Sequence, residues 1–145
     1  MVLTMQVATA VIEAAHRHAA ERGAPSAVAV VDAGGNLLGF MAHEDAILAA
    51  RDLATNKAFT ALSLRASTAD LTDAVQPGGP FYALNNALAG RPLVTFAGGL
   101  PLRDPETGTI VGAVGVSGGT LEDDSEISAA GLAAFAELGT GGTDG

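Results

Sequence analysis

The sequence predicts a single α+β domain in which helices pack against an antiparallel sheet of about five strands. Its 145 residues suit one domain with one sizeable core. Hydrophobic residues make up 48% and charged residues 16%, a balance typical of folded chains rather than disordered ones. Short β-rich runs are separated by turn-forming residues, which indicates hairpins and the order α-β-β-α-α-β-β-β-α. We expect residues 1–138 to form the domain and residues 139–145 to form a flexible C-terminal tail.

Residues 3–22 have the pattern of an amphipathic helix. Apolar residues, among them Val7 and Val11, fall on one side at helical spacing, and polar residues fall on the other. Gly23 followed by Pro25 predicts the end of this helix.

The next segment is typical of a β-hairpin. Residues 27–32 (AVAVVD) and 37–41 (LLGFM) are strand-like, and residues 33–36 (AGGN) form a turn between them. The nearly continuous apolar character of the first run predicts a central strand that is covered on both faces.

A second helix is expected over residues 45–64, with apolar residues on nearly every side, so it must be covered on more than one side. Residues 67–75 favour a short third helix, and residues 76–80 (QPGGP) interrupt the chain.

The last part of the chain predicts three strands and a helix. The strands are residues 93–96, 100–103 and 109–117, of which the last (TIVGAVGVS) has the strongest pattern. The final helix runs from Thr120 to about Leu138.

Composition excludes several classes of function. The chain has 7 basic and 16 acidic residues, a net charge of −9, and no basic stripe, so we expect neither nucleic acid nor an anionic membrane as partner. The absence of cysteine excludes disulfides and thiolate sites. We see no secretory signal, and no apolar run nears the ~18 residues of a membrane span, so the expected location is cytoplasmic. Nineteen glycines and many alanines bury little area each, which favours a homo-oligomer.

Three stretches together resemble the GlcG/HbpS family. They are residues 52–61 (DLATNKAFTA), 98–102 (GGLPL) and 110–120 (IVGAVGVSGGT), the last followed by acidic residues and an alanine-rich helix. With the hairpin around residues 32–36, the resemblance spans nearly the whole chain.

The resemblance implies a profilin-like five-stranded antiparallel sheet flanked by helices, similar to the C-terminal domain of PduO-type cobalamin adenosyltransferases, in dimers or larger rings. It also implies a small-ligand-binding protein, with haem or a related tetrapyrrole as the expected cofactor. The chain departs from the family pattern at residues 41–46 (MAHEDA) and at residues 122–124 (EDD). Both departures lie near the expected pocket.

His18 is the expected ligand of the haem iron. It falls within the apolar arc of the first helix, where apolar neighbours would hold a porphyrin, and haem-binding members of the family are described as using a histidine of this helix. The alternative is a core or interface histidine bonded to a carbonyl. His16 falls on the polar side of the same helix and is the weaker candidate.

Lys57, the single lysine, is expected to be partly buried in the second helix. It could bind a carboxylate, such as a haem propionate, or it could form an ion pair with Asp32, Asp52 or another internal acid. Other residues expected beside the ligand are Phe81, Tyr82, Ser117 and Gly118. The glycine-containing loop of residues 115–120 has a competing structural interpretation, in which Thr120 and Asp123 cap the final helix.

A second hypothesis is a small cofactor-free or metal-assisted enzyme that acts on a small organic acid in a catabolic pathway. His43, Asp45 and Lys57 would transfer protons, because an imidazole ionises near neutral pH. His43 is also a candidate metal ligand. The structural alternative is that Asp45 begins the second helix and that Asp32 belongs to the hairpin turn.

Overall fold

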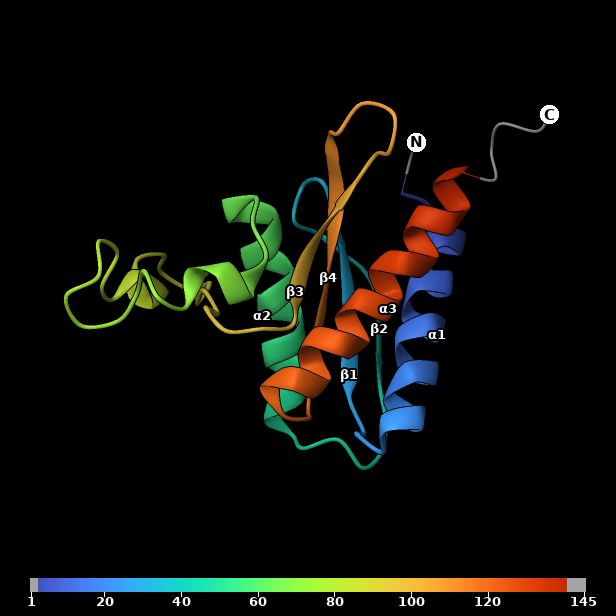
Figure 1. The fold of residues 1–145 in the computed structure, drawn as a ribbon, viewed down its shortest axis with the longest axis horizontal. Helices are drawn as coiled ribbons and strands as arrows, with labels where there is room; N and C mark the ends of the chain where they lie inside the picture. Colours follow the sequence, from blue (N-terminus) through green and yellow to red (C-terminus); the bar gives the residue numbers. More distant parts are fainter. Residues whose placement is uncertain (1–2, 141–145) are drawn as a thin grey trace.

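A computed structural model describes residues 3–140, which form a four-stranded antiparallel sheet with helices on both faces (Figure 1). The strands lie in the order β2-β1-β4-β3. Helices α1 and α3 lie side by side against one face, and α2 covers the other. The elements are α1 (Met5–Arg22), β1 (Ala27–Asp32), β2 (Leu37–Ala42), α2 (Ala49–Leu64), β3 (Gly99–Arg103), β4 (Ile110–Ser117) and α3 (Leu121–Thr140).

The central strand β1 is buried on both faces, as its apolar run predicts. Val28 and Val30 pack with α1 and α3, whereas Ala27 and Ala29 pack with α2. This division follows from the strand period of two, which sends successive side chains to opposite faces.

Small residues allow α2 to lie directly on β4. A Cβ atom added to Gly115 would overlap the carbonyl oxygen of Ala54 and approach the amide nitrogen of Ala58 to 2.6 Å. The glycine- and alanine-rich composition therefore serves close helix–sheet packing within the chain.

The predicted fifth strand, residues 93–96, does not form. Side-chain hydroxyls bond to its backbone groups instead: the Val94 amide donates to Thr60 Oγ1 at 2.9 Å, and Thr72 Oγ1 donates to the Thr95 carbonyl at 2.7 Å. Backbone groups that are satisfied in this way need no neighbouring strand.

The short helix expected at residues 67–75 begins where predicted but is shorter. A short 3₁₀ helix, Thr68–Leu71, is present there, and turns occupy residues 72–75. Its first residue, buried Thr68, accepts a hydrogen bond through Oγ1 from the Gly99 amide at the start of β3. A second 3₁₀ turn, Leu84–Asn86, lies in the long connection before β3.

The ends of two helices differ from expectation. Helix α2 begins at Ala49 rather than at residue 45, since turns occupy the preceding residues. Helix α3 continues to Thr140, and the rest of the predicted tail lies outside the described residues.

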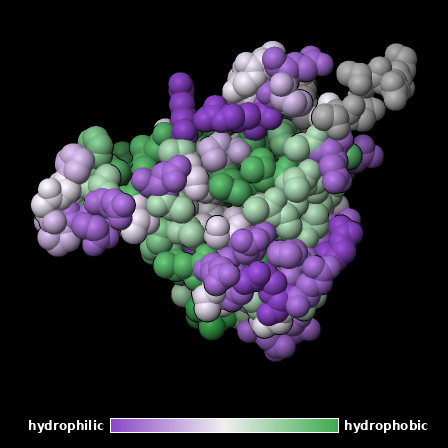
Figure 2. Space-filling model, in the orientation of Figure 1, coloured by the Kyte–Doolittle hydropathy of each residue, from purple (hydrophilic) through white to green (hydrophobic). Residues whose placement is uncertain are grey.

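Acidic and polar side chains gather over the first half of α3, and its alanine-rich second half is more hydrophobic (Figure 2). None of the helices within residues 3–140 is both long and apolar enough to cross a membrane.

Candidate functional site

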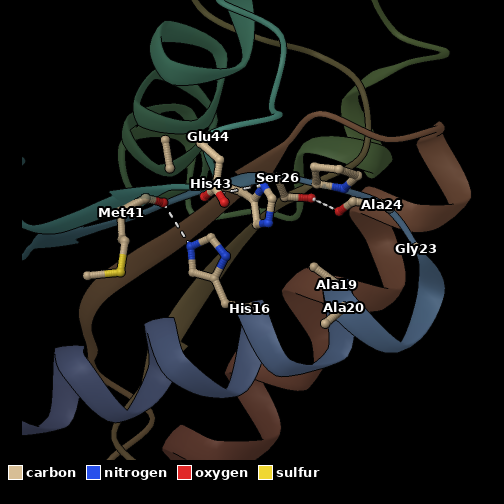
Figure 3. Close-up of a pocket in the computed structure, with 11 residues that line it drawn as sticks. His16, Ala19, Ala20, Gly23, Ala24, Ser26, Met41, His43 and Glu44 are labelled. Atoms are coloured by element: carbon tan, nitrogen blue, oxygen red, sulfur yellow. Dashed lines mark hydrogen bonds and ion pairs between the residues drawn. The ribbon is translucent and has the colours of Figure 1, made fainter.

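A pocket of about 440 Å³ lies between the C-terminal end of α1 and the end of β2 (Figure 3). Most of its wall consists of small or apolar residues, and His16, His43 and Glu44 supply its ionisable groups. The remaining lining residues are Ala19, Ala20, Gly23, Ala24, Pro25, Ser26, Met41 and Ala42.

His16 reaches this pocket from α1. Its Nε2 lies 2.8 Å from the carbonyl oxygen of Met41 on β2. A carbonyl only accepts hydrogen bonds, so Nε2 carries the proton, and in the neutral ring Nδ1 has the free lone pair.

The helical pattern placed His16 on the polar side and left it out of the expected site. Strand β2 extends beside this side of α1, so the ring is partly covered. The sequence did contain one indication that this side of the helix is partly buried, because apolar residues flank His16 on the same helix face. Buried Ile12 and Ala19 lie four residues before and three residues after His16, on the same helix face.

His43 enters the pocket from the turn after β2. Its Nδ1 accepts a hydrogen bond of 3.0 Å from the Asp45 amide, and its own amide donates to the Ser26 carbonyl at 2.9 Å. An amide only donates, so Nδ1 has the lone pair, and the proton of the neutral ring is on Nε2.

Asp45 therefore contacts His43 through its backbone. Its carboxylate lies 4.0 Å from His43 Nδ1, and that of Glu44 lies 3.7 Å away. No set of three His, Asp or Glu side chains in the part of the chain that the structure describes is arranged to hold a metal ion.

His18 faces away from this pocket, two residues further along α1. Its Nδ1 lies 3.2 Å from Glu21 Oε2, and its side chain is 32% exposed. A carboxylate accepts hydrogen bonds, so Nδ1 is the donor, and in the neutral ring Nε2 has the lone pair.

Lys57 is fully buried, with its ammonium group enclosed by three partners. Nζ lies 2.9 Å from Asp124 Oδ2, 2.9 Å from the Val116 carbonyl and 4.9 Å from the centre of the Phe96 ring. Burial lowers the pKa of Lys57, and the charge of Asp124 opposes that shift. The Lys57 ammonium group therefore pairs with an internal acid, as in the structural alternative given above. Lys57 is not among the residues that line the pocket of His43.

The sequence analysis did not identify Asp124 as the partner of Lys57. It belongs to the acidic run at the start of α3, where an acid is ordinarily explained by helix capping. Its Oδ1 also accepts from the Gly119 amide at 3.1 Å. Burial raises the pKa of Asp124, and Lys57 opposes that shift.

The loop before α3 satisfies its own hydrogen-bonding groups. The Thr120 amide donates to Asp123 Oδ2 at 3.0 Å, and the Asp123 amide donates to Thr120 Oγ1 at 3.1 Å. This is the reciprocal capping expected from the sequence. Ser117 is buried, and Gly118 packs against the backbone of Pro25.

The remaining candidates lie apart from the histidines. Phe81 and Tyr82 are exposed, on the long connection that projects away from α1 in Figure 1. Asp32 holds the hairpin turn, because its Oδ1 accepts from the amides of Gly34 and Asn36 at 2.9 and 3.0 Å.

Comparison with known proteins decides the family. Residues 3–133 match the family model described as "Haem degrading protein HbpS-like". The chain belongs to the HbpS-like family.

Three similar proteins are matched by this HbpS-like chain over most of their length. A 15.0 kDa protein from the dhaT-dhaS intergenic region of Citrobacter freundii is 41% identical over 136 residues, which is 94% of each chain. The crystal structure of Klebsiella pneumoniae protein ORFY is similar with a TM-score of 0.87 at 36% identity, covering 92% of this chain and 90% of that one. A structure described as a PduOC:heme complex has a TM-score of 0.87 at 35% identity, covering 92% and 95%.

Proposed function

We propose that this HbpS-like protein binds haem or a closely related tetrapyrrole, with Nε2 of His18 as the axial ligand of the iron. Two similarities support the haem class: the family model is described as haem degrading, and a relative at 35% identity has been solved with haem.

The observation that carries the choice of ligand is the hydrogen bond between His18 and Glu21. Iron binds the unprotonated nitrogen of an imidazole, and the other ring nitrogen of a metal-ligating histidine usually donates to a carboxylate or carbonyl. Glu21 Oε2, 3.2 Å from Nδ1, supplies that acceptor and leaves Nε2 available. In neutral His43, by contrast, the lone pair on Nδ1 is taken by the Asp45 amide. His16 donates Nε2 to the Met41 carbonyl, so it could bind iron only through Nδ1.

His18 lies on the same face of α1 as Val11, seven residues before it, and Arg22, four residues after it. Helix α3 passes close to α1 here, with Gly131 near Val11 and Arg22 bonded to Asp123 at 2.9 Å. A porphyrin bound to a side chain that is 32% exposed would leave its other face in water. We therefore propose a homo-oligomer in which a second copy of the chain covers that face.

Titration with hemin tests the proposal. We expect micromolar wild-type protein to shift the Soret band with a stoichiometry of one haem per chain, and His18→Ala to weaken binding by at least about tenfold. His16→Ala and His43→Ala are the matched controls and should bind hemin as the wild type does. A wild-type protein without a Soret shift would overturn haem binding. Normal binding by His18→Ala, with loss in either control, would overturn the choice of ligand.

A further inference from the structure

The pocket between α1 and β2 presents two ring nitrogens with opposite hydrogen-bonding roles. Figure 3 shows the rings of His16 and His43 entering from different elements, with the nitrogen that is not bonded to the protein backbone on each ring directed into the space between them. Whether each of these nitrogens donates or accepts is fixed by the backbone group that bonds to the other nitrogen of the same ring.

The Met41 carbonyl fixes the proton of His16 on Nε2, at 2.8 Å, so its inward nitrogen, Nδ1, is an acceptor. The Asp45 amide fixes the lone pair of His43 on Nδ1, at 3.0 Å, so its inward nitrogen, Nε2, is a donor. Two neutral histidines thus offer one acceptor and one donor to the same cavity.

The hydroxyl and the carbonyl of Ser26, which also belong to the wall, are already engaged. Ser26 donates its hydroxyl to the Ala24 carbonyl at 2.8 Å, and its own carbonyl accepts from the His43 amide at 2.9 Å. Glu44 lies at the edge, with its carboxylate 3.7 Å from His43 Nδ1, and its charge repels an anionic guest. The remaining wall is apolar, and the volume of about 440 Å³ falls within the range of small-molecule sites.

We propose that this pocket is a second binding site, separate from His18, for a small neutral molecule with an amide group. The amide oxygen accepts from His43 Nε2, and the amide N–H donates to His16 Nδ1. The hydrocarbon part of the guest packs against the small side chains of the wall, represented by Ala20 and Pro25. This inference does not depend on haem binding, because it uses different nitrogens on a different face of α1.

Benzamide is a suitable probe, and N,N-dimethylbenzamide, which lacks the amide N–H, is its matched control. Imidazole ¹H–¹⁵N spectra of the full-length chain would follow the titration. We expect benzamide to shift the His16 and His43 signals saturably, with a dissociation constant of about 1 mM, as is ordinary for so small a ligand. The dimethyl compound should bind at least about tenfold more weakly, because Nδ1 of His16 is left without a donor.

Two variants separate this site from the haem site. His16→Phe should weaken benzamide at least about tenfold and retain hemin binding, whereas His18→Ala should retain benzamide and lose hemin. The inference is overturned if wild-type signals show no saturable shift, if both amides bind equally, or if benzoate binds more tightly than benzamide. The comparison of the two amides uses only wild-type protein, so it stands even if a variant fails to fold.

Discussion

Nζ of Lys57 and Oδ2 of Asp124 lie 2.9 Å apart, with side-chain exposures of 0% and 4%. This pair joins α2 on one side of the sheet to the start of α3, beside the Val116 carbonyl of β4. This internal ion pair therefore connects the two helical layers. If either partner were neutralised, the remaining charge would be buried away from water.

We expect Asp124→Asn to destabilise the fold by about 3–5 kcal/mol, because it leaves the Lys57 ammonium buried without its counter-charge. Urea unfolding measures the change, and Glu122→Gln, an exposed neighbour on the same helix, should alter stability by less than about 0.5 kcal/mol. The double variant Lys57→Met, Asp124→Leu should recover most of the loss. A cost of under about 1 kcal/mol for Asp124→Asn would contradict a buried charged pair.

The carboxylate of Asp123 should make stability depend on acid pH. The Thr120 backbone amide, followed by Arg22, lowers the pKa of Asp123 below its ordinary value of 3.8. A group with a lowered folded-state pKa contributes stability fully above the unfolded pKa and loses it as the pH falls through the folded pKa.

The advantage of wild type over Asp123→Asn in urea unfolding should therefore stay constant from about pH 7 to pH 5 and shrink below about pH 4. In an Arg22→Gln background, the advantage at neutral pH should be smaller, because one partner of the carboxylate at 2.9 Å has been removed. If the stability advantage grew on acidification, the pKa of Asp123 would not be lowered in the folded state.

Gly115→Ala should be strongly destabilising, by about 1–3 kcal/mol or more, because the new methyl group meets the backbone of α2 rather than a movable side chain. Gly131→Ala is the matched control. Its Cβ would come no closer than 3.2 Å to Val11, and alanine favours a helix over glycine by about 1 kcal/mol. Thermal or urea unfolding compares the two, and similar losses in both would contradict backbone contact at Gly115.

Glu21→Gln should weaken hemin binding by about 10–100-fold if Glu21 orients His18, because carboxylates of this kind fix the tautomer of a ligating histidine. Glu13→Gln, an exposed position on the same helix, is the control for the loss of one negative charge. The readout is the Soret titration together with the absorption maximum of the complex. Equal affinity for wild type and Glu21→Gln would show that the bond of 3.2 Å has no part in binding.

Local pattern sufficed for the elements whose stability is local. The amphipathic repeat of α1, the turn at Asp32 and the reciprocal capping of Thr120 with Asp123 all depend on residues within a few positions of one another. The order of the sequence motifs also predicted the family, and the family match over residues 3–133 confirms that prediction.

Tertiary structure decided whatever depends on a distant partner. Residues 93–96 have the composition of a strand, yet hydroxyls of Thr60 and Thr72 satisfy their backbone groups. The same holds for Lys57, whose counter-charge is 67 residues away in sequence, and for His16, which is partly covered because β2 passes beside it. Periodicity reports which side of an element is apolar. Only the packed chain determines which atoms of another element lie within hydrogen-bonding distance, since long-range pairing follows from the shape of the whole core rather than from neighbouring residues.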